Sequence, residues 1–208
     1  MSDADGTPTL VAFGDSITEA AGVTAPNSWT VLLERRLAED GTPFRVINSG
    51  IGGNTTVIGL ARIDADVLPH RPDLVTIEFG LNDCNVVEDV VPRTPPDQFR
   101  ENQRRIGQLI GDQTGATLCF ITNQPTLRNL TMADGLRFDE QNREYNEITR
   151  DVARELGAAV IDIERAFNRP NVNLTEALTE DGVHLTEYGN REYAEAIGDA
   201  LSRELSAT

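Results

Sequence analysis

Five short apolar runs rich in Val and Ile, separated by longer stretches of helical periodicity, constrain the fold of this chain more than any other feature. The runs are Leu10–Phe13, Phe44–Asn48, Leu74–Phe79, Ala116–Thr122 and Ala158–Ile163. The helical stretches are Ser28–Asp40, Thr56–Leu68, Pro96–Gln113, Asp139–Leu156 and Thr186–Leu205. Continuous apolar runs are typical of parallel strands that are buried on both faces. Their alternation with helices predicts an α/β fold, a flavodoxin-like three-layer α/β/α sandwich around a five-stranded parallel sheet.

The size of the chain favours one domain over residues 1–208. Its 208 residues, 39% of them hydrophobic, can build one core but hardly two. No run reaches the roughly 18 apolar residues of a membrane span, and the polar, acidic start is unlike a signal peptide. The two cysteines, Cys84 and Cys119, fit a reducing compartment better than a disulfide framework. We therefore expect a cytoplasmic protein.

The charge balance is strongly acidic. Thirty-four Asp and Glu residues face eighteen basic residues, for a net charge of −16, and every basic residue is Arg. A GC-rich genome would explain the missing Lys but not the excess of acid. Such self-repulsion is tolerated best where salt screens it, so we expect a halophilic, high-salt setting. The same charge argues against nucleic acid as a partner, because phosphate backbones bind basic surfaces.

Small polar motifs follow the predicted strands at their carboxyl ends, where open α/β sheets hold their ligands. Gly14-Asp15-Ser16 follows the first strand, and Asn48 to Gly53 follows the second. The third strand runs into Gly80-Leu81-Asn82-Asp83, and Asp181-Gly182-Val183-His184 lies near the end of the chain.

Ser, Gly, Asn and His in this order, each in its own block, resemble the SGNH branch of the GDSL hydrolases. The resemblance extends from Gly14 to His184 and so covers nearly the whole chain. It implies a serine esterase that works through an acyl-serine intermediate. It also implies that no cofactor or metal is needed and that the partner is a small-molecule ester rather than nucleic acid or a membrane.

Within this family pattern Ser16 is the candidate nucleophile. A serine hydroxyl attacks well only when a base takes its proton. The structural alternative is that Ser16 caps a helix, because Ile17-Thr18-Glu19 could open one. Asp15 is too close in sequence to serve as the acid of a triad, and we assign it a structural role in the turn.

His184 is the candidate base. The chain has only one other histidine, His70, which lies in a polar turn before the third strand, at the end of the sheet opposite the site. An imidazole, with an ordinary pKa of about 6.5, can accept and return a proton at neutral pH. Asp181, three residues before His184, can orient the ring and stabilise the imidazolium. Glu180 is the alternative acid.

The oxyanion of an acyl-transfer intermediate needs preorganised donors. The candidates are the backbone N–H groups of Ser16 and Gly53 and the side-chain amide of Asn82. Glycine allows the backbone to approach a substrate closely because it has no Cβ. Simple turns would account for the Gly and Asn residues one at a time, but not for their joint order. Asn48 is expected to brace the second loop without a catalytic role.

Other classes of protein fit the sequence less well. A dinucleotide fingerprint would need glycine at Thr55, and a chain without Lys cannot carry a P-loop. Asp15, Asp83 and His184 could bind a metal, but one histidine with two carboxylates is a poor zinc set. The remaining alternative is a flavodoxin-like, non-catalytic binding module.

Two long loops leave the carboxyl ends of strands and are candidates for substrate walls: Cys84–Pro95 and Asn123–Phe138. The second carries Leu127, Leu130, Met132 and Leu136 among polar residues, although it could also be a plain surface loop. Because aromatic residues make up only 5% of the chain, we expect short-chain acyl esters, among them acetyl esters, as substrates. An acyl thioesterase or a lysophospholipase of the same family is the alternative.

Overall fold

The computed structural model describes residues 6–86, 92–128, 135 and 137–205. In chain order the elements are β1 (Thr9–Gly14), α1 (Ser16–Glu19), η1 (Ala25–Asn27), α2 (Trp29–Glu39), β2 (Arg45–Gly50), α3 (Thr56–Asp66), η2 (Leu68–His70), β3 (Leu74–Glu78), α4 (Pro96–Thr114), β4 (Thr117–Ile121), α5 (Phe138–Leu156), β5 (Ala159–Ile161), α6 (Ile163–Phe167), α7 (Leu174–Ala177) and α8 (Glu187–Leu205). All five predicted strands and all five predicted helices are present, with ends shifted by a few residues.

The strands of the described residues form one parallel sheet in the order β2-β1-β3-β4-β5. β1 lies between β2 and β3, and Gly14 at its end is in register with Gly50 and Glu78. Every residue of β1 and β3 is buried, which explains why both strands read as continuous apolar runs. The predicted parallel α/β fold is confirmed.

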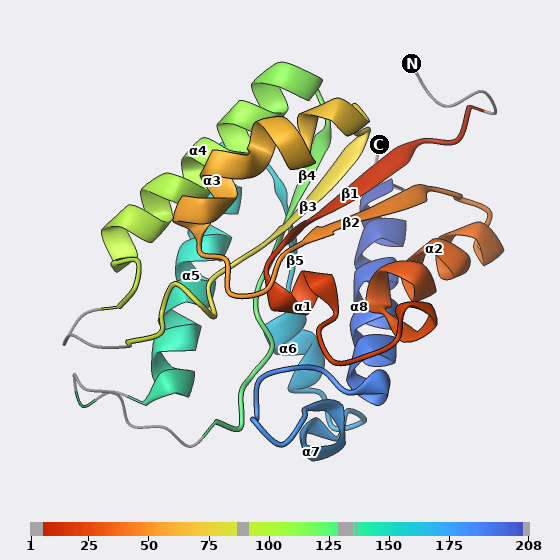
Figure 1. The fold of residues 1–208 in the computed structure, drawn as a ribbon. Coiled ribbons are helices and arrows are strands. Elements are labelled where there is room, and N and C mark those ends of the chain that lie inside the picture. Colours follow the sequence, from red (N-terminus) through yellow and green to blue (C-terminus); the bar gives the residue numbers. More distant parts are fainter. Residues whose placement is uncertain (1–5, 87–91, 129–134, 136, 206–208) are drawn as a thin grey trace.

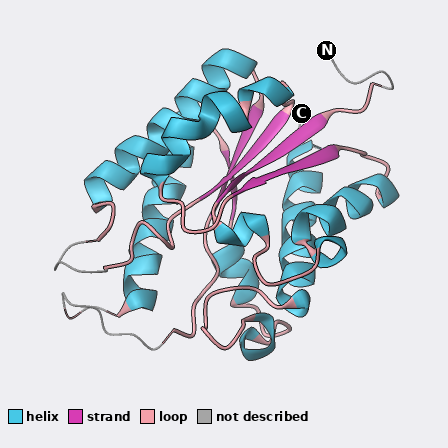
Figure 2. Ribbon diagram, viewed as in Figure 1, coloured by secondary structure: helices cyan, strands magenta, loops and turns pink. Residues whose placement is uncertain are grey.

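Helices cover both faces of the sheet, as Figures 1 and 2 show. α3, α4 and α5 pack side by side on one face, and α2, α6 and α8 pack on the other. The carboxyl ends of the strands meet at the edge where α1 and the long loops lie. No helix in the described ranges is long and apolar enough to cross a membrane.

The last strand differs most from its prediction. The expected run Ala158–Ile163 forms a strand only over Ala159–Ile161, because Asp162 caps α6 by accepting a hydrogen bond from the backbone N–H of Arg165. Ile163 is buried all the same, as the first residue of that helix. Its apolar character therefore signals burial rather than strand structure.

Candidate active site

Ser16 lies at the sharp turn between β1 and α1. Gly14 ends the strand where a Cβ would come within 2.1 Å of Thr18 Oγ1 and 2.6 Å of the Glu78 carbonyl oxygen, so only glycine fits. Asp15 is the N-cap of α1, and its carboxylate accepts a hydrogen bond from the backbone N–H of Ile17. Capping is thus done by Asp15, and the hydroxyl of Ser16 remains available for chemistry.

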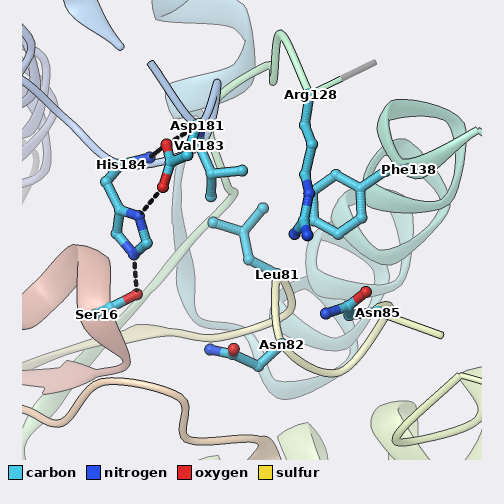
Figure 3. Close-up of a pocket in the computed structure, with 9 residues that line it drawn as sticks. All are labelled: Ser16, Leu81, Asn82, Asn85, Arg128, Phe138, Asp181, Val183 and His184. Carbon is cyan, nitrogen blue, oxygen red and sulfur yellow. Dashed lines mark hydrogen bonds and ion pairs between the residues drawn. The ribbon is translucent and has the colours of Figure 1, made fainter. Parts of the chain in front are cut away.

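A chain of hydrogen bonds links the predicted triad (Figure 3). His184 Nε2 lies 2.9 Å from Ser16 Oγ, and His184 Nδ1 lies 2.5 Å from Asp181 Oδ2. The structure therefore brings together three residues from the two ends of the chain. The three have the mutual geometry of nucleophile, base and orienting acid.

The second oxygen of Asp181 explains why this carboxylate stays charged. Asp181 Oδ1 accepts hydrogen bonds from the backbone N–H groups of Val183 and His184, at 2.8 and 3.0 Å, and from the hydroxyl of Thr179. Partial burial alone would raise the pKa of Asp181, but these donors together with His184 lower the pKa well below its ordinary value. Asp181 is therefore an acceptor fixed in place by its own loop.

The other histidine is far from this chemistry. His70 ends η2, the short turn that precedes β3 and hence lies at the amino end of that strand. The site is at the opposite, carboxyl edge of the parallel sheet. Asp181 is hydrogen-bonded to both the backbone N–H and the ring of His184, whereas no hydrogen bond joins Glu180, the alternative acid, to His184.

Asp15 and Glu78 form a buried pair of carboxyl groups directly beneath the site. Burial raises the pKa of Asp15 to about 6, and burial together with the charge of Asp15 raises the pKa of Glu78 well above its usual range. Glu78 Oε2 accepts a hydrogen bond from Thr18 Oγ1 at 2.9 Å. Two carboxylates in one dry site repel each other, so each disfavours ionisation of the other.

Asn82 is tied to this pair. Its side-chain N–H₂ donates one hydrogen bond, 3.0 Å long, to Asp15 Oδ2. An amide nitrogen carries two hydrogens, so the second remains available to a ligand. Asn82 follows β3 and Asp15 follows β1, and the two strands are neighbours in the sheet. This contact between two predicted motifs was not foreseen from the sequence.

Asp83, the other acidic residue of that motif, has a different partner. Its carboxylate accepts hydrogen bonds from the backbone N–H of Thr56 at 3.0 Å and from the Thr56 hydroxyl at 2.6 Å. It therefore fixes the start of α3, and no hydrogen bond joins it to His184. Within the described ranges, no three His, Cys, Asp or Glu side chains are grouped so as to hold a metal ion.

The glycine loop after β2 is held by neighbours on both sides. Asn48 donates through its amide to the Thr18 carbonyl oxygen at 2.7 Å and accepts from the Gly50 N–H at 2.9 Å, as its predicted bracing role requires. Gly53 has a φ of 75°, in the left-handed region that favours glycine, and a Cβ there would meet nothing within 4 Å. Its carbonyl oxygen accepts a hydrogen bond from Arg93 at 3.3 Å.

A cavity of about 320 Å³ opens beside the nucleophile. Nine described residues line it: Ser16, Leu81, Asn82, Asn85, Arg128, Phe138, Asp181, Val183 and His184. The triad and Asn82 are at one end, Arg128, Phe138 and Asn85 are at the other, and Leu81 and Val183 lie between them in Figure 3. Gly53 is not among the lining residues.

The second predicted loop contributes to this cavity in an unexpected way. Leu127 is 47% exposed and does not line the cavity, whereas Arg128 and Phe138 do. Leu130, Met132 and Leu136 lie outside the described residues, as do residues 87–91 of the first loop. The backbone N–H of Leu127 donates to the Gly182 carbonyl oxygen at 2.8 Å, and Gln124 Nε2 donates to that of Val183. The loop that carries Arg128 is thus bonded to the loop that carries the triad acid and base.

Comparison with known proteins places this chain in a family. Residues 12–192 match the model of the GDSL-like lipase/acylhydrolase family. The esterase TesA of Pseudomonas aeruginosa is 45% identical over 75 residues, which span 36% of this chain and 37% of that protein.

Solved structures agree over the whole fold. A lipase/acylhydrolase from Enterococcus faecalis is 27% identical with a TM-score of 0.80, and the match covers 95% of this chain and 97% of that one. The acetyl xylan esterase AlAXEase is 26% identical with a TM-score of 0.77, over 93% and 99% of the two chains. The chain therefore belongs to the GDSL-like lipase/acylhydrolase family, a family of carboxylic ester hydrolases.

Proposed function

We propose that this protein is a serine esterase that hydrolyses short-chain acyl esters through an acyl-serine intermediate. The observation that carries the proposal is the continuous set of hydrogen bonds from Asp181 through His184 to Ser16. A non-catalytic binding module would have no need for a nucleophile, a base and a fixed acid in this geometry.

In the first step the Ser16 hydroxyl attacks the ester carbonyl carbon while His184 Nε2 accepts its proton. The carbonyl π bond opens to a tetrahedral oxyanion, and Asp181 stabilises the imidazolium that has formed. Collapse of this intermediate expels the alcohol, which takes the proton from His184. A water molecule, activated by the same nitrogen, then attacks the acyl-serine and releases the carboxylic acid.

Three donors are assigned to the oxyanion: the backbone N–H groups of Ser16 and Gly53 and the second amide hydrogen of Asn82. Within the described part of the chain, no group accepts a hydrogen bond from either of these backbone N–H groups. The bond from Asn82 to Asp15 holds the amide at a fixed angle. Donors that are oriented before the substrate arrives stabilise developing charge most effectively.

The preference for short acyl groups rests on the cavity. Its volume of about 320 Å³ lies at the low end of the roughly 300–1,000 Å³ of ligand sites. Leu81 and Val183 provide an apolar wall next to the triad. One of the similar structures is named an acetyl xylan esterase, and acetyl is a short acyl group. Long-chain lipid esters, acyl thioesters and lysophospholipids are the competing substrates.

The test combines covalent labelling with a substrate panel. A fluorophosphonate should label the wild type but not Ser16→Ala, and that variant should lose several orders of magnitude in turnover. His184→Ala should be similarly inactive, whereas the matched change His70→Ala should leave turnover nearly unchanged. Acetyl and butyryl esters should be hydrolysed faster than octanoyl esters, acyl-CoA or lysophospholipid. Normal labelling of Ser16→Ala would disprove the assignment of the nucleophile.

A further inference from the structure

The end of the cavity farther from the triad carries a positive charge that the proposed reaction does not use. Of the nine lining residues, only Arg128 has a permanently charged cationic side chain. Its guanidinium carbon lies 5.2 Å from the centre of the Phe138 ring. Because Phe138 is buried and begins α5, the ring is a fixed platform for the guanidinium.

Stacking engages the face of a guanidinium and leaves the N–H groups at its edge free to donate. No carboxylate of the described residues forms an ion pair with Arg128. By contrast, Arg36, Arg62, Arg100 and Arg150 each bond to at least one acidic side chain. Arg128 is thus a cation held close to an aromatic ring, and it lines the cavity without a carboxylate partner among the described residues.

Asn85 adds a second donor at the same end. Its side chain lines the cavity and, among the described groups, has no hydrogen-bond partner for its amide. Its backbone carbonyl oxygen accepts from the backbone N–H of Arg93 at 3.0 Å, which fixes the position of the residue. In Figure 3 the guanidinium of Arg128 and the amide of Asn85 face the same space.

The positive charge of Arg128 stands out against the negative electrostatic potential of the rest of the chain. The chain carries a net charge of −16, so its long-range potential repels anionic substrates. Asp181 also faces the cavity, but its two oxygens are occupied by His184, Thr179 and backbone N–H groups. An anion that enters would therefore find its favourable partners at the end formed by Arg128 and Asn85.

We propose that Arg128 and Asn85 form an anion subsite, and that the substrate is an ester bearing a carboxylate or another anionic group. This inference rests on the proposed esterase function. Leu81 and Val183 lie between the subsite and the triad, so a short apolar segment separates the anionic group from the scissile ester. The anionic group can belong to the acyl part or to the alcohol part of the substrate.

Two matched pairs of substrates show whether the anionic group belongs to the acyl part or to the alcohol part. Monoethyl glutarate and ethyl pentanoate differ by a carboxylate on the acyl part. Para-acetoxybenzoate and para-acetoxybenzamide differ by a carboxylate on the alcohol part. For each pair kcat/KM is measured with a pH-stat near an ionic strength of about 0.1 M, where the screening length is about 10 Å. The wild type should prefer the anionic member of at least one pair.

The decisive variant is Arg128→Gln, which removes the charge and keeps a polar side chain. It should lower kcat/KM about tenfold for the preferred anionic ester and change the neutral partner by less than about twofold. Arg128→Lys should retain part of the preference, and Asn85→Ala should lower it to a smaller extent. The loss should lie mainly in KM.

The matched control is Arg35→Gln. Arg35 is exposed on α2, away from the cavity, and the change alters the net charge by the same amount. If both variants lose the preference equally, the general field is responsible and the subsite is disproved. An equal loss on anionic and neutral esters in Arg128→Gln would show a packing role and would also overturn it.

Failure of the subsite is distinguishable from failure of the esterase function. If wild-type protein hydrolyses neutral esters and Ser16 reacts with a fluorophosphonate, but no anionic ester is preferred, only the subsite is wrong. If Ser16 does not react and no ester is hydrolysed, the proposed function itself fails.

Discussion

Two aspartates lie near Ser16, the proposed nucleophile, and have opposite environments. The side chain of Asp181 is 49% exposed, and hydrogen bonds lower its pKa, whereas Asp15 is fully buried and burial raises its pKa to about 6. Asp181 is hydrogen-bonded to the imidazole of His184, and Asp15 caps α1 and accepts a hydrogen bond from Asn82. Proximity to a catalytic serine therefore does not decide which carboxylate is the acid of the triad. The hydrogen-bond donors around each carboxylate, and the side chains to which it is bonded, decide this assignment.

The largest effect that tests this comparison is expected from Asp181→Asn. An amide can still contact His184 Nδ1 but favours the wrong tautomer and cannot stabilise the imidazolium, so turnover should fall by about 10⁴-fold. Glu180→Gln, one residue earlier, is the matched control and should leave turnover within about twofold, because no hydrogen bond joins Glu180 to the ring. Steady-state kinetics on a neutral ester measures both. Similar losses of turnover in the two variants would show that Asp181 is not the specific partner of His184.

A smaller loss should follow from changes at Asn82 and Asp15. Asn82→Ala removes one oxyanion donor and should lower turnover by roughly 10²–10³-fold without unfolding the protein. Asp15→Asn keeps an oxygen for the cap but can turn an amide N–H₂ towards that of Asn82, so it should cost no more than Asn82→Ala.

If Asp15 acts through Asn82, the two losses should not add in the double variant. Full additivity would mean that Asp15 acts on catalysis by another route. Thermal melting of each variant separates a loss of catalysis from a loss of fold.

The two aspartates should also contribute to stability with opposite dependence on pH. For Asp15 the folded pKa is raised, so its contribution is fully present below the ordinary value of 3.8 and is lost as the pH rises through about 6. For Asp181 the folded pKa is lowered, so its contribution is present above 3.8 and is lost as the pH falls.

Melting temperatures test these signs. The difference between wild type and Asp15→Asn should shrink as the pH rises from about 5 to about 7.5. The difference between wild type and Asp181→Asn should shrink as the pH falls from about 5 to about 3. If the two differences in melting temperature changed in the same direction with pH, the two aspartates would not have opposite environments.

The smallest effect should come from salt. Surface carboxylates repel one another across a chain of net charge −16, and their screening length shrinks from about 10 Å at 0.1 M to about 3 Å at 1 M. The melting temperature should rise between about 0.1 M and 2 M potassium chloride, with most of the gain early in that range. A flat profile would argue against a high-salt setting and leave the catalytic comparison untouched.

The sheet was predicted from local patterns, and the triad residues were predicted from the resemblance of their ordered polar blocks to a known family. Apolar runs marked the strands, and Ser16, Asp181 and His184 each stood in a short polar block after or near a strand. The choice between His184 and His70 needed only the rule that parallel strands place their carboxyl ends at one edge.

The contacts between blocks could not be predicted in the same way. The bond from Asn82 to Asp15 depends on β1 and β3 being neighbours, and the strand order was not deduced from the sequence. Arg128 lies in a loop without periodicity, so nothing in the pattern separated it from the other arginines. Its role depends on the ring of Phe138, ten positions later in the chain.

The backbone hydrogen bond between Leu127 and Gly182 has a consequence for how this enzyme can diversify. Gly182 has a φ of 71°, and a Cβ there would come within 2.6 Å of the backbone of Leu127 and Arg128. The segment that carries Arg128 and the segment that carries Asp181 and His184 are therefore held together through their backbones. Insertions or deletions after β4 should alter turnover together with selectivity, which limits the loop to changes of side chain rather than of length.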